Sequence, residues 1–193
     1  MGHPLHRGFG GIKGWATRPD GHLLALERQE TQGKGNYNVW ILPLSGDRKP
    51  RQFPESSFQT VQPQFSPNGK WLAYTSTESG GIEVYVVPYP AGSGKWPVST
   101  AGGAYPRWRR DGKELYYLSP DDKMMAAEIR ESAGKLEIGA PRALFQVRQI
   151  ARVGYPYDVT ADGSRFLVSV QTEQPSTESL TLVVNWPAQL NKK

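Results

Sequence analysis

Residues 64–74 read QFSPNGKWLAY and contain an Asn-Gly pair that ends at Gly69. An Asn-Gly pair supplies the positive φ angles that a tight β-hairpin turn needs. Phe65 stands four residues before the glycine, while Leu72 and Tyr74 stand three and five residues after it. This alternation on both sides of the turn predicts two antiparallel strands, each with one apolar face.

The same turn signal recurs along the chain. It reads RPDG, SPNG, RRDG and TADG, and the turn glycines are Gly21, Gly69, Gly112 and Gly163. The glycines are 48, 43 and 51 residues apart, and three positions after them stand Leu24, Leu72, Leu115 and Phe166. A period in the forties with a hairpin at its centre is typical of a four-stranded propeller blade.

Further β-rich runs follow each hairpin. The third runs span residues 37–42, 82–87, 123–129 and 180–186, and weaker fourth runs span residues 48–53, 95–100 and 142–147. Residues 123–128 have a helix-forming composition, but the register of the repeat requires a strand there, and tertiary context overrides propensity in short segments. The sequence therefore predicts an all-β fold, a β-propeller of about four four-stranded blades whose last blade is incomplete.

The repeat also predicts the domain organisation. We expect a single propeller domain over residues 13–187, with residues 1–12 as a leader or closing strand and residues 188–193 as a tail. The predicted blades span residues 13–53, 61–100, 104–147 and 155–187.

The first and last blades depart from the pattern. Trp15 lies six residues before its turn glycine, whereas Phe65 and Trp108 lie four before theirs, which predicts a β-bulge in the inner strand of the first blade. The outer place of the last blade is vacant, and the spare segment 4–13 is rich in glycine, which makes it a poor strand. Two arrangements stay open: a small ring closed by this segment, or a half ring whose edges pair with a second copy in a homodimer.

Composition and charge fit one domain with a sizeable core. The 193 residues are 37% hydrophobic, and Lys+Arg 23 against Asp+Glu 18 gives a formal net charge of +5. With no cysteine, the chain has no disulfide, thiolate zinc site, iron–sulfur cluster or cysteine nucleophile. It shows neither the apolar run of about 18 residues that spans a membrane nor the apolar stretch of a secretory signal. We expect a soluble protein without a cofactor.

A family resemblance accompanies these motifs. Residues 64–74, together with EVYV at 83–86, closely resemble the WD40-like repeat of the TolB propeller family. More narrowly, PRWRRDGKEL at 106–115 and LVVNWP at 182–187 resemble the last blades of propellers that follow the kinase domain in bacterial receptor-type serine/threonine kinases. The resemblance covers residues 13–187. It implies a sensing, scaffolding or protein-binding role, and an extracytoplasmic place if the chain derives from such a receptor.

The resemblance carries over no catalytic residue, because its motifs specify turns and blade packing. The chain has no kinase machinery and no Gly-x-Ser-x-Gly elbow, and its three histidines lie in the leader or directly after a turn glycine. Asp20, Asp111 and Asp162 belong to the hairpin turns, where carboxylates accept hydrogen bonds from backbone amides. The carboxylates predicted near the functional end are Asp121, Asp122 and Asp158. No calcium-loop pattern is present, so no metal site is predicted.

A basic and aromatic cluster surrounds the third turn. Its members are Tyr105, Arg107, Trp108, Arg109, Arg110 and Lys113. Together with a pI near 9.4, this cluster is compatible with nucleic-acid binding. Alternation along a strand divides the cluster between two faces, however. We therefore expect Trp108 to pack between blades and the arginines to be solvated or paired, and nucleic acid is not the expected partner.

The loops before the inner strands share one end of a propeller with the loops between second and third strands, and the Asp-Gly turns lie at the other end. This loop face is the predicted binding surface for a protein or a small ligand. Aromatic residues and arginine dominate interface energetics, so they are the candidate anchors. The predicted binding residues are Phe58, Tyr105, Arg107, Arg148, Arg152, Tyr155 and Asp158.

Two functions are compatible with this sequence. The first is a non-enzymatic propeller module for protein or ligand interaction, of the sensor or scaffold type. The second is a hydrolase acting on a sugar or an ester, with carboxylates from different blades lining the channel. Two acidic side chains about 5 to 10 Å apart in one open pocket would favour the hydrolase. A shallow face rich in aromatic residues would favour protein binding.

Overall fold

The computed structural model describes residues 12–29, 36–90, 92–132, 135–148, 150–152, 154–171 and 180–183. In these ranges the chain forms strands β1 to β16 and no α-helix, so the all-β prediction is confirmed. The strand predicted over residues 123–128 is confirmed as part of β11 (Lys123–Ser132), despite its helix-forming composition. No helix long and apolar enough to cross a membrane occurs in the same ranges.

The strands form four antiparallel sheets in chain order. Sheet 1 contains β1 (Ile12–Thr17), β2 (Leu23–Gln29), β3 (Tyr37–Pro43) and β4 (Arg51–Gln52). Sheet 2 contains β5 (Thr60–Phe65), β6 (Trp71–Ser76), β7 (Glu83–Pro88) and β8 (Trp96–Pro97). Sheet 3 contains β9 (Ala104–Trp108), β10 (Glu114–Leu118), β11, β12 (Lys135–Ile138) and β13 (Arg142–Gln146). Sheet 4 contains β14 (Tyr157–Val159), β15 (Phe166–Ser169) and β16 (Leu180–Val183).

The turn glycines of the repeat all lie between the first two strands of a sheet, as predicted. The φ angles of Gly21, Gly69, Gly112 and Gly163 are 73°, 69°, 73° and 73°. Each glycine N–H donates to the carbonyl three residues earlier, at 2.8 to 2.9 Å. The four hairpins therefore share one turn geometry, and an offset counted from the glycine places a residue at the same point of every sheet.

Consecutive sheets pack face to face through apolar side chains. Val39 and Ile41 of sheet 1 share a cluster with Leu72 and Tyr74 of sheet 2. Similar clusters lie between sheets 2 and 3 and between sheets 3 and 4, the last one around Phe166. Burying one such side chain contributes about 1.5 to 3 kcal/mol, so these contacts are the main stabilising interaction of the fold.

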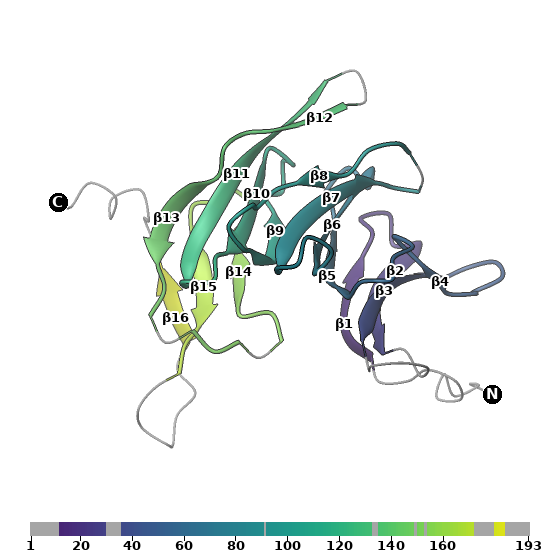
Figure 1. Ribbon diagram of the computed structural model, residues 1–193, viewed down its shortest axis with the longest axis horizontal. Helices are drawn as coiled ribbons and strands as arrows, with labels where there is room; N and C mark the ends of the chain where they lie inside the picture. The colour runs from purple at the N-terminus through teal and green to yellow at the C-terminus, as the bar shows by residue number, and fades with distance from the viewer. Residues whose placement is uncertain are drawn as a thin grey trace.

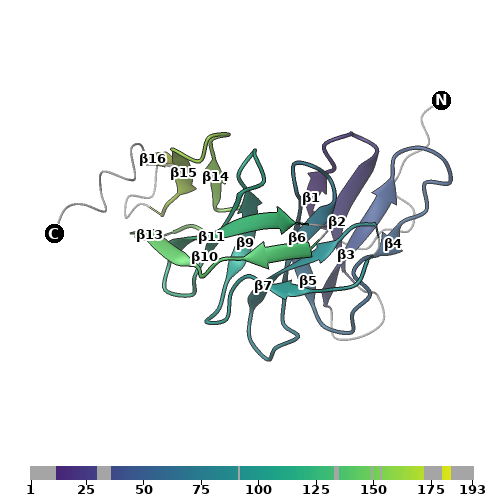
Figure 2. The ribbon, with the colours of Figure 1, turned by 90° about the horizontal axis from the view of Figure 1, so that it is seen from above.

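The sheets follow one another around an arc (Figure 1). The inner strands β1, β5, β9 and β14 lie on its concave side, and the later strands of each sheet fan outward. Seen from above, sheets 1 and 4 lie at opposite ends of the described part (Figure 2). Residues 12 and 13 of the proposed closing segment 4–13 belong to β1, while its other residues and the tail at 188–193 lie outside the described residues.

The β-bulge predicted in the first inner strand is confirmed by the register shift between Ile12 and Trp15. It is not special to that strand, because β5 and β9 shift register at the equivalent place. The bulge position lies seven residues before each turn glycine and is occupied by Gly14, Gln62 and Tyr105. The altered spacing at Trp15 was therefore a weak signal for a feature that sheets 1, 2 and 3 share.

The β11–β12 hairpin was not predicted from the sequence. β11 continues past its pairing with β10, and its far end pairs with β12. Leu136 of this hairpin packs into the cluster between sheets 2 and 3. Glu131 accepts hydrogen bonds from Lys70 Nζ at 2.9 Å and from Asn68 Nδ2 at 3.1 Å, so the hairpin ties sheet 3 to the turn of sheet 2.

This tie predicts an acid-sensitive contribution to stability. The hydrogen bond from Lys70 lowers the pKa of Glu131 below its ordinary 4.5. A carboxylate whose pKa is lowered in the folded state stabilises the fold above its unfolded pKa, and this contribution is lost as pH falls through the folded pKa. We expect Glu131→Gln to lower the free energy of unfolding at pH 7 by about 0.5 to 1 kcal/mol and to flatten its decline below pH 4.5. Urea titrations at several pH values measure both effects, and Glu137→Gln on the same hairpin is the control.

The turn glycines allow a matched test of sheet packing. A Cβ on Gly163 would lie 2.2 Å from Tyr116 Oη, and that buried hydroxyl is held by Glu114 Oε2 at 2.7 Å. A Cβ on Gly21 would meet nothing within 4 Å. Gly21→Ala should therefore cost about 1 kcal/mol for the positive φ alone, whereas Gly163→Ala should cost about 1 to 3 kcal/mol more. Equal losses in urea unfolding would show that the fourth sheet does not pack on the third as described.

Candidate functional site

A polar cavity of about 260 Å³ opens at the inner ends of the sheets, away from the Asp-Gly turns. Sheets 1, 2 and 3 and the segment that leads into β14 all contribute to its wall. The lining residues are Gly14, Glu27, Tyr37, Gln59, Val61, Gln62, Tyr105, Arg152, Gly154 and Tyr155. We call this space the axial cavity. Its place corresponds to the loop face predicted from the repeat.

Side-chain oxygens connect the bulges of neighbouring inner strands. Glu27 Oε1 of sheet 1 accepts the N–H of Gln62 in β5 at 2.9 Å. Gln62 Oε1 in turn accepts the N–H of Tyr105 in β9 at 2.8 Å and the hydroxyl of Thr75 at 2.7 Å. Gln62 and Tyr105 have φ angles of 57° and 61°, a conformation that non-glycine residues rarely adopt. Each of these two strained bulges is thus held by a side-chain oxygen from the sheet before it.

Gly14 holds the equivalent position in β1, where a side chain has no room. A Cβ at this position would lie 2.6 Å from Oε1 of the buried Glu27 carboxylate. The absence of a side chain at Gly14 therefore lets Glu27 stand between β1 and β5 at the wall of the axial cavity.

Tyr155 crosses the concave side of the arc. Its hydroxyl donates to the carbonyl of Pro63 in β5 at 3.3 Å, and its ring meets that of Tyr105 edge-on with centroids 6.2 Å apart. The guanidinium carbon of Arg107 lies 4.2 Å from the centroid of the Tyr155 ring, a cation–π contact. Burial raises the pKa of the Tyr155 hydroxyl, which stays protonated and able to donate. This side chain links the lead-in to sheet 4 with sheets 2 and 3.

Arg152 stands at the mouth of the axial cavity. Its Nη2 donates to Asp122 Oδ1 and, at 3.4 Å, to the carbonyl of Ser119. Asp122 lies in the β10–β11 turn of sheet 3 with a φ of 60°. The pair fixes the segment before β14 to sheet 3 and leaves the arginine side chain about one-third exposed, with relative exposure 37%.

The predicted binding residues divide into two groups. Tyr105, Arg152 and Tyr155 line the axial cavity, and Arg107 lies over Tyr155. Asp158 Oδ1 lies 3.9 Å from Nε of Arg107, an atom that is buried and makes no hydrogen bond. The structure does not bring the other two to the cavity: Phe58 is exposed in the β4–β5 loop and Arg148 is exposed after β13.

Sequence reasoning missed Glu27 and Gln62, which hold the bulges. Both have positions fixed by the repeat: Gln62 stands seven residues before a turn glycine, and Glu27 stands six after one. Comparing polar residues at these two offsets would have found them. Residue type alone does not identify them, because each acts through a contact with a neighbouring sheet.

The carboxylates of three hairpin turns have the structural role that the sequence predicted for them. Asp20, Asp111 and Asp162 each accept the N–H two residues later, at 2.9 to 3.0 Å. Hydrogen bonds from Thr160 and Ser164 lower the pKa of Asp162, and one from Arg109 lowers that of Asp111. Within the described ranges no three His, Cys, Asp or Glu side chains gather in a group that could hold a metal ion.

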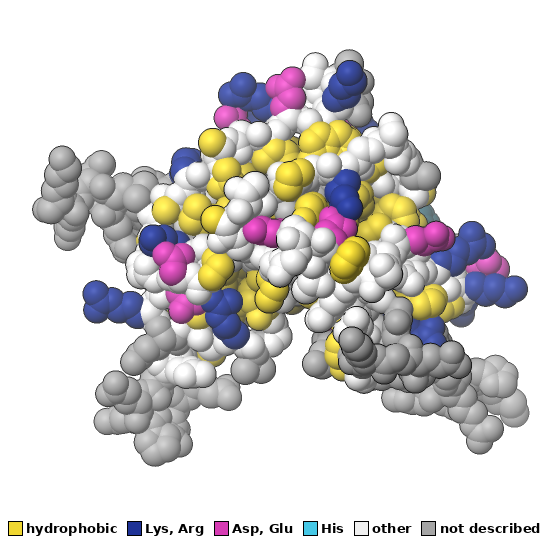
Figure 3. Space-filling model, in the orientation of Figure 1, with side chains coloured by type: hydrophobic (Ala, Val, Ile, Leu, Met, Phe, Trp, Pro, Cys, Tyr) yellow, Lys and Arg dark blue, Asp and Glu magenta, His cyan; other side chains and the backbone are white. Residues whose placement is uncertain are grey.

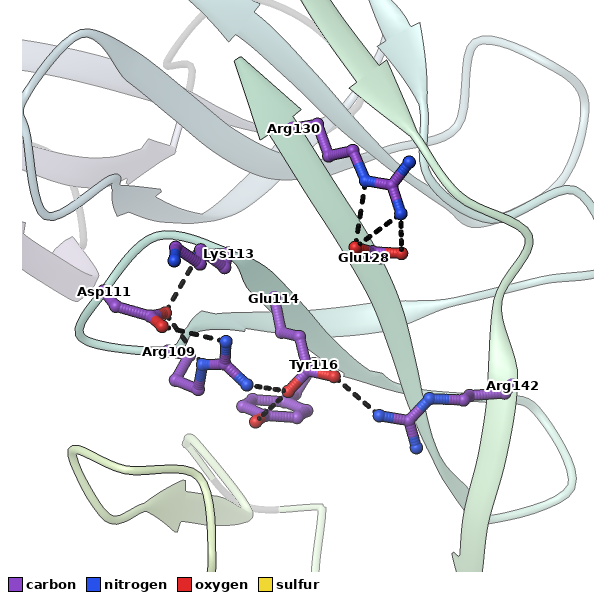
Figure 4. Close-up of polar contacts among 8 residues, drawn as sticks. All are labelled: Arg109, Asp111, Lys113, Glu114, Tyr116, Glu128, Arg130 and Arg142. Atoms are coloured by element: carbon purple, nitrogen blue, oxygen red, sulfur yellow. Dashed lines mark hydrogen bonds and ion pairs between the residues drawn. The ribbon is translucent and has the colours of Figure 1, made fainter.

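The basic cluster around the third turn is engaged in packing and ion pairs. Trp108 packs between sheets 2 and 3 and donates its Nε1–H to the carbonyl of Gln64 at 3.1 Å. Arg109 binds both oxygens of Asp111 and one oxygen of Glu114 (Figure 4). The other Glu114 oxygen accepts a bond from Arg142 at 2.6 Å.

Charged side chains are dispersed on the face seen in Figure 3. Hydrophobic side chains gather over its middle, and most lysine and arginine side chains project near its edges. Positive charge on this face therefore does not form a continuous stripe of the kind that follows a nucleic-acid backbone.

Comparison with known proteins supports the fold. No family model matches the chain. The structure superposes on TolB from Acinetobacter baumannii with a TM-score of 0.64 at 16% identity, covering 90% of this chain and 40% of that one. It superposes on an oligogalacturonate lyase in complex with manganese with a TM-score of 0.62 at 12% identity, covering 90% of this chain and 50% of that one.

The fold is that of a TolB-like β-propeller. In sequence, 77 residues are 34% identical to Tricorn protease homolog 1 of Streptomyces coelicolor. The match covers 40% of this chain and 6% of that protein. This chain covers at most half the length of each of the two solved structures named above. At these identities the solved structures define the fold alone, and the narrower resemblance to receptor-kinase propellers stays a prediction.

The hydrogen bonds between bulges give a testable prediction for the site. Gln62→Ala removes the acceptor of the partly buried Tyr105 N–H and should lower the free energy of unfolding by about 1 to 3 kcal/mol. Gln62→Glu keeps an acceptor oxygen at this place and should lose less than half as much. Urea unfolding of both variants measures the difference, and equal losses would indicate that the side-chain oxygen does not hold the bulge of β9.

Proposed function

We propose that this TolB-like propeller is a non-enzymatic interaction module that binds a polypeptide or small ligand in the axial cavity. One observation carries the proposal: residues from sheets 1, 2 and 3 and from the lead-in to sheet 4 converge on one cavity rich in tyrosine, with an arginine at its mouth. Tyrosine and arginine are enriched at the centres of protein interfaces.

The polar groups of the cavity wall support a binding role. Glu27 and Gln62 hold backbone bulges, and Arg152 is neutralised by Asp122. Tyr105 keeps a rigid aromatic surface at the wall because its backbone is fixed by Gln62. A preformed wall of this kind lowers the ordering cost of binding. The expected partner is a protein or small ligand, and derivation from a receptor-type parent would place this sensor or scaffold outside the cytoplasm.

A second candidate function rests on Glu27, a buried carboxylate at the wall of the cavity. A glycoside hydrolase commonly uses two carboxylates that flank its substrate, and Glu27 is the one carboxylate among the described lining residues. Glu27→Gln keeps the side chain's shape and an acceptor for the Gln62 N–H. We expect no turnover of ester, glycoside or peptide substrates by the wild-type protein. A measured turnover that Glu27→Gln abolishes would establish the hydrolase in place of the binding module.

Selection of binding peptides tests the proposed function. Peptides chosen from a random phage-displayed library on the wild-type protein should bind Arg152→Ala at least about ten-fold more weakly, because an interface arginine contributes about 1.4 kcal/mol or more. The matched control is Arg130→Ala, which removes an exposed arginine paired with Glu128 on β11, outside the cavity lining. Affinities are measured by isothermal titration calorimetry. Peptides that bind both variants as tightly as the wild type would place the binding surface elsewhere.

A further inference from the structure

The turn glycines show that one face of sheet 1 is open at its turn, where the same place in every later sheet is covered. A Cβ on Gly69 would meet Arg18 Nε at 2.8 Å, one on Gly112 would meet Pro67 Cδ at 3.8 Å, and one on Gly163 would meet Tyr116 Oη at 2.2 Å. Each of these neighbours belongs to the sheet before. Gly21 has no atom within 4 Å of such a Cβ.

Apolar side chains on this face of sheet 1 show the same contrast. Trp15, six residues before its glycine, is 67% exposed, whereas Pro63, Pro106 and Tyr157 at that offset are buried. Leu44 is 40% exposed. The Leu44 N–H donates to the carbonyl of His22, the residue that follows the turn glycine. In sheet 2 the Tyr89 N–H donates to the carbonyl of Lys70 in the same way, so Tyr89 is the counterpart of Leu44.

The covered counterparts show what this face normally contacts. Tyr89 packs edge-on against Phe53, which follows β4 of sheet 1, with ring centroids 5.0 Å apart, inside the cluster between sheets 1 and 2. Leu24 is partly exposed, whereas its counterparts Leu72, Leu115 and Phe166 are fully buried at 0%. We call the surface of Trp15, Leu24 and Leu44 the leading face. It has the composition of an inter-sheet contact.

The complementary surface lies at the other end of the arc. Leu167 of sheet 4, four residues after its turn glycine, is 40% exposed. Its counterparts Ala25, Ala73 and Tyr116 are 0% exposed because the next sheet covers them. We call the surface around Leu167 the trailing face. Figure 1 shows sheets 1 and 4 at the two ends of the arc, with an opening between them.

We propose that the leading face of one molecule packs on the trailing face of a second copy of this chain, twice around a two-fold axis. The two faces are halves of the contact that joins consecutive sheets within the molecule. One chain supplies both halves, and its sheets 1 and 4 lie apart at the two ends of the arc. A two-fold rotation pairs both ends at once and leaves no unpaired sheet face. This interface is separate from the axial cavity, so it does not depend on the proposed function.

The mass in solution tests the pairing. The wild-type chain should sediment with twice its mass of 21.5 kDa at micromolar concentration. Trp15→Glu and Leu167→Glu should each give monomers by placing a charge on one of the two faces. Ile82→Glu alters a side chain that is 56% exposed on neither face and should leave the dimer intact. A wild-type chain that stays monomeric at all concentrations would overturn the proposal and assign the two faces to sheets of another protein or of a longer chain.

Cross-linking tests the orientation of the two copies. Because the chain has no cysteine, thiols can be placed singly. The double variant Trp15→Cys/Leu167→Cys, treated with a short bis-maleimide, should give a covalent dimer without higher species. Each single variant should stay uncoupled, because the proposed contact joins Trp15 of one copy to Leu167 of the other. Efficient coupling of Trp15→Cys alone would show that like faces pair and would refute the head-to-tail arrangement.

Discussion

The packing of one sheet on the next is the constraint on which the rest of this structure depends. A single twisted sheet of three to five short strands has two largely apolar faces and cannot bury both by itself. The turn glycines show how closely neighbours approach: a Cβ at Gly69 or Gly163 would overlap side-chain atoms of the preceding sheet. Glycine therefore suits all four turns because of their positive φ, and at Gly69 and Gly163 also because a neighbouring sheet leaves little space for a side chain.

The axial cavity is a consequence of the same packing. Glu27 and Gln62 reach from their own strands to the bulges that line the concave side, so the shape of the wall follows from the angle between neighbouring sheets. Removing an acceptor from a bulge leaves a partly buried amide unsatisfied and at the same time moves Tyr105, a wall residue. The same few hydrogen bonds therefore contribute to the stability of the fold and to the shape of the cavity. They hold Gln62 and Tyr105 at positive φ angles, which are strained for residues other than glycine.

The turns and strands could be predicted from the sequence because each is determined by residues close together within one repeat. The turn glycines, the apolar offsets and the strand at residues 123–128 all follow from a period that can be counted. The β11–β12 hairpin escaped prediction because it interrupts that period in one sheet, and its role depends on Glu131 meeting the turn of sheet 2. At the site, Tyr105, Arg152 and Tyr155 were found from residue type, whereas Glu27 and Gln62 act through contacts between sheets that no single stretch of sequence displays.

Tyr155 shows why a predicted anchor can have a structural role as well. The sequence predicts it as an anchor because it is an aromatic residue on a loop, yet its hydroxyl donates to Pro63 and its ring contacts Arg107. The bond to Pro63 joins segments 92 residues apart in the chain and spans the concave side of the arc. A ligand that packs on the exposed part of this ring would also restrain the contact between sheet 4 and sheet 2, because the same side chain takes part in both. Binding in the axial cavity would therefore oppose any opening of the arc, and the energy of that restraint would appear as part of the affinity.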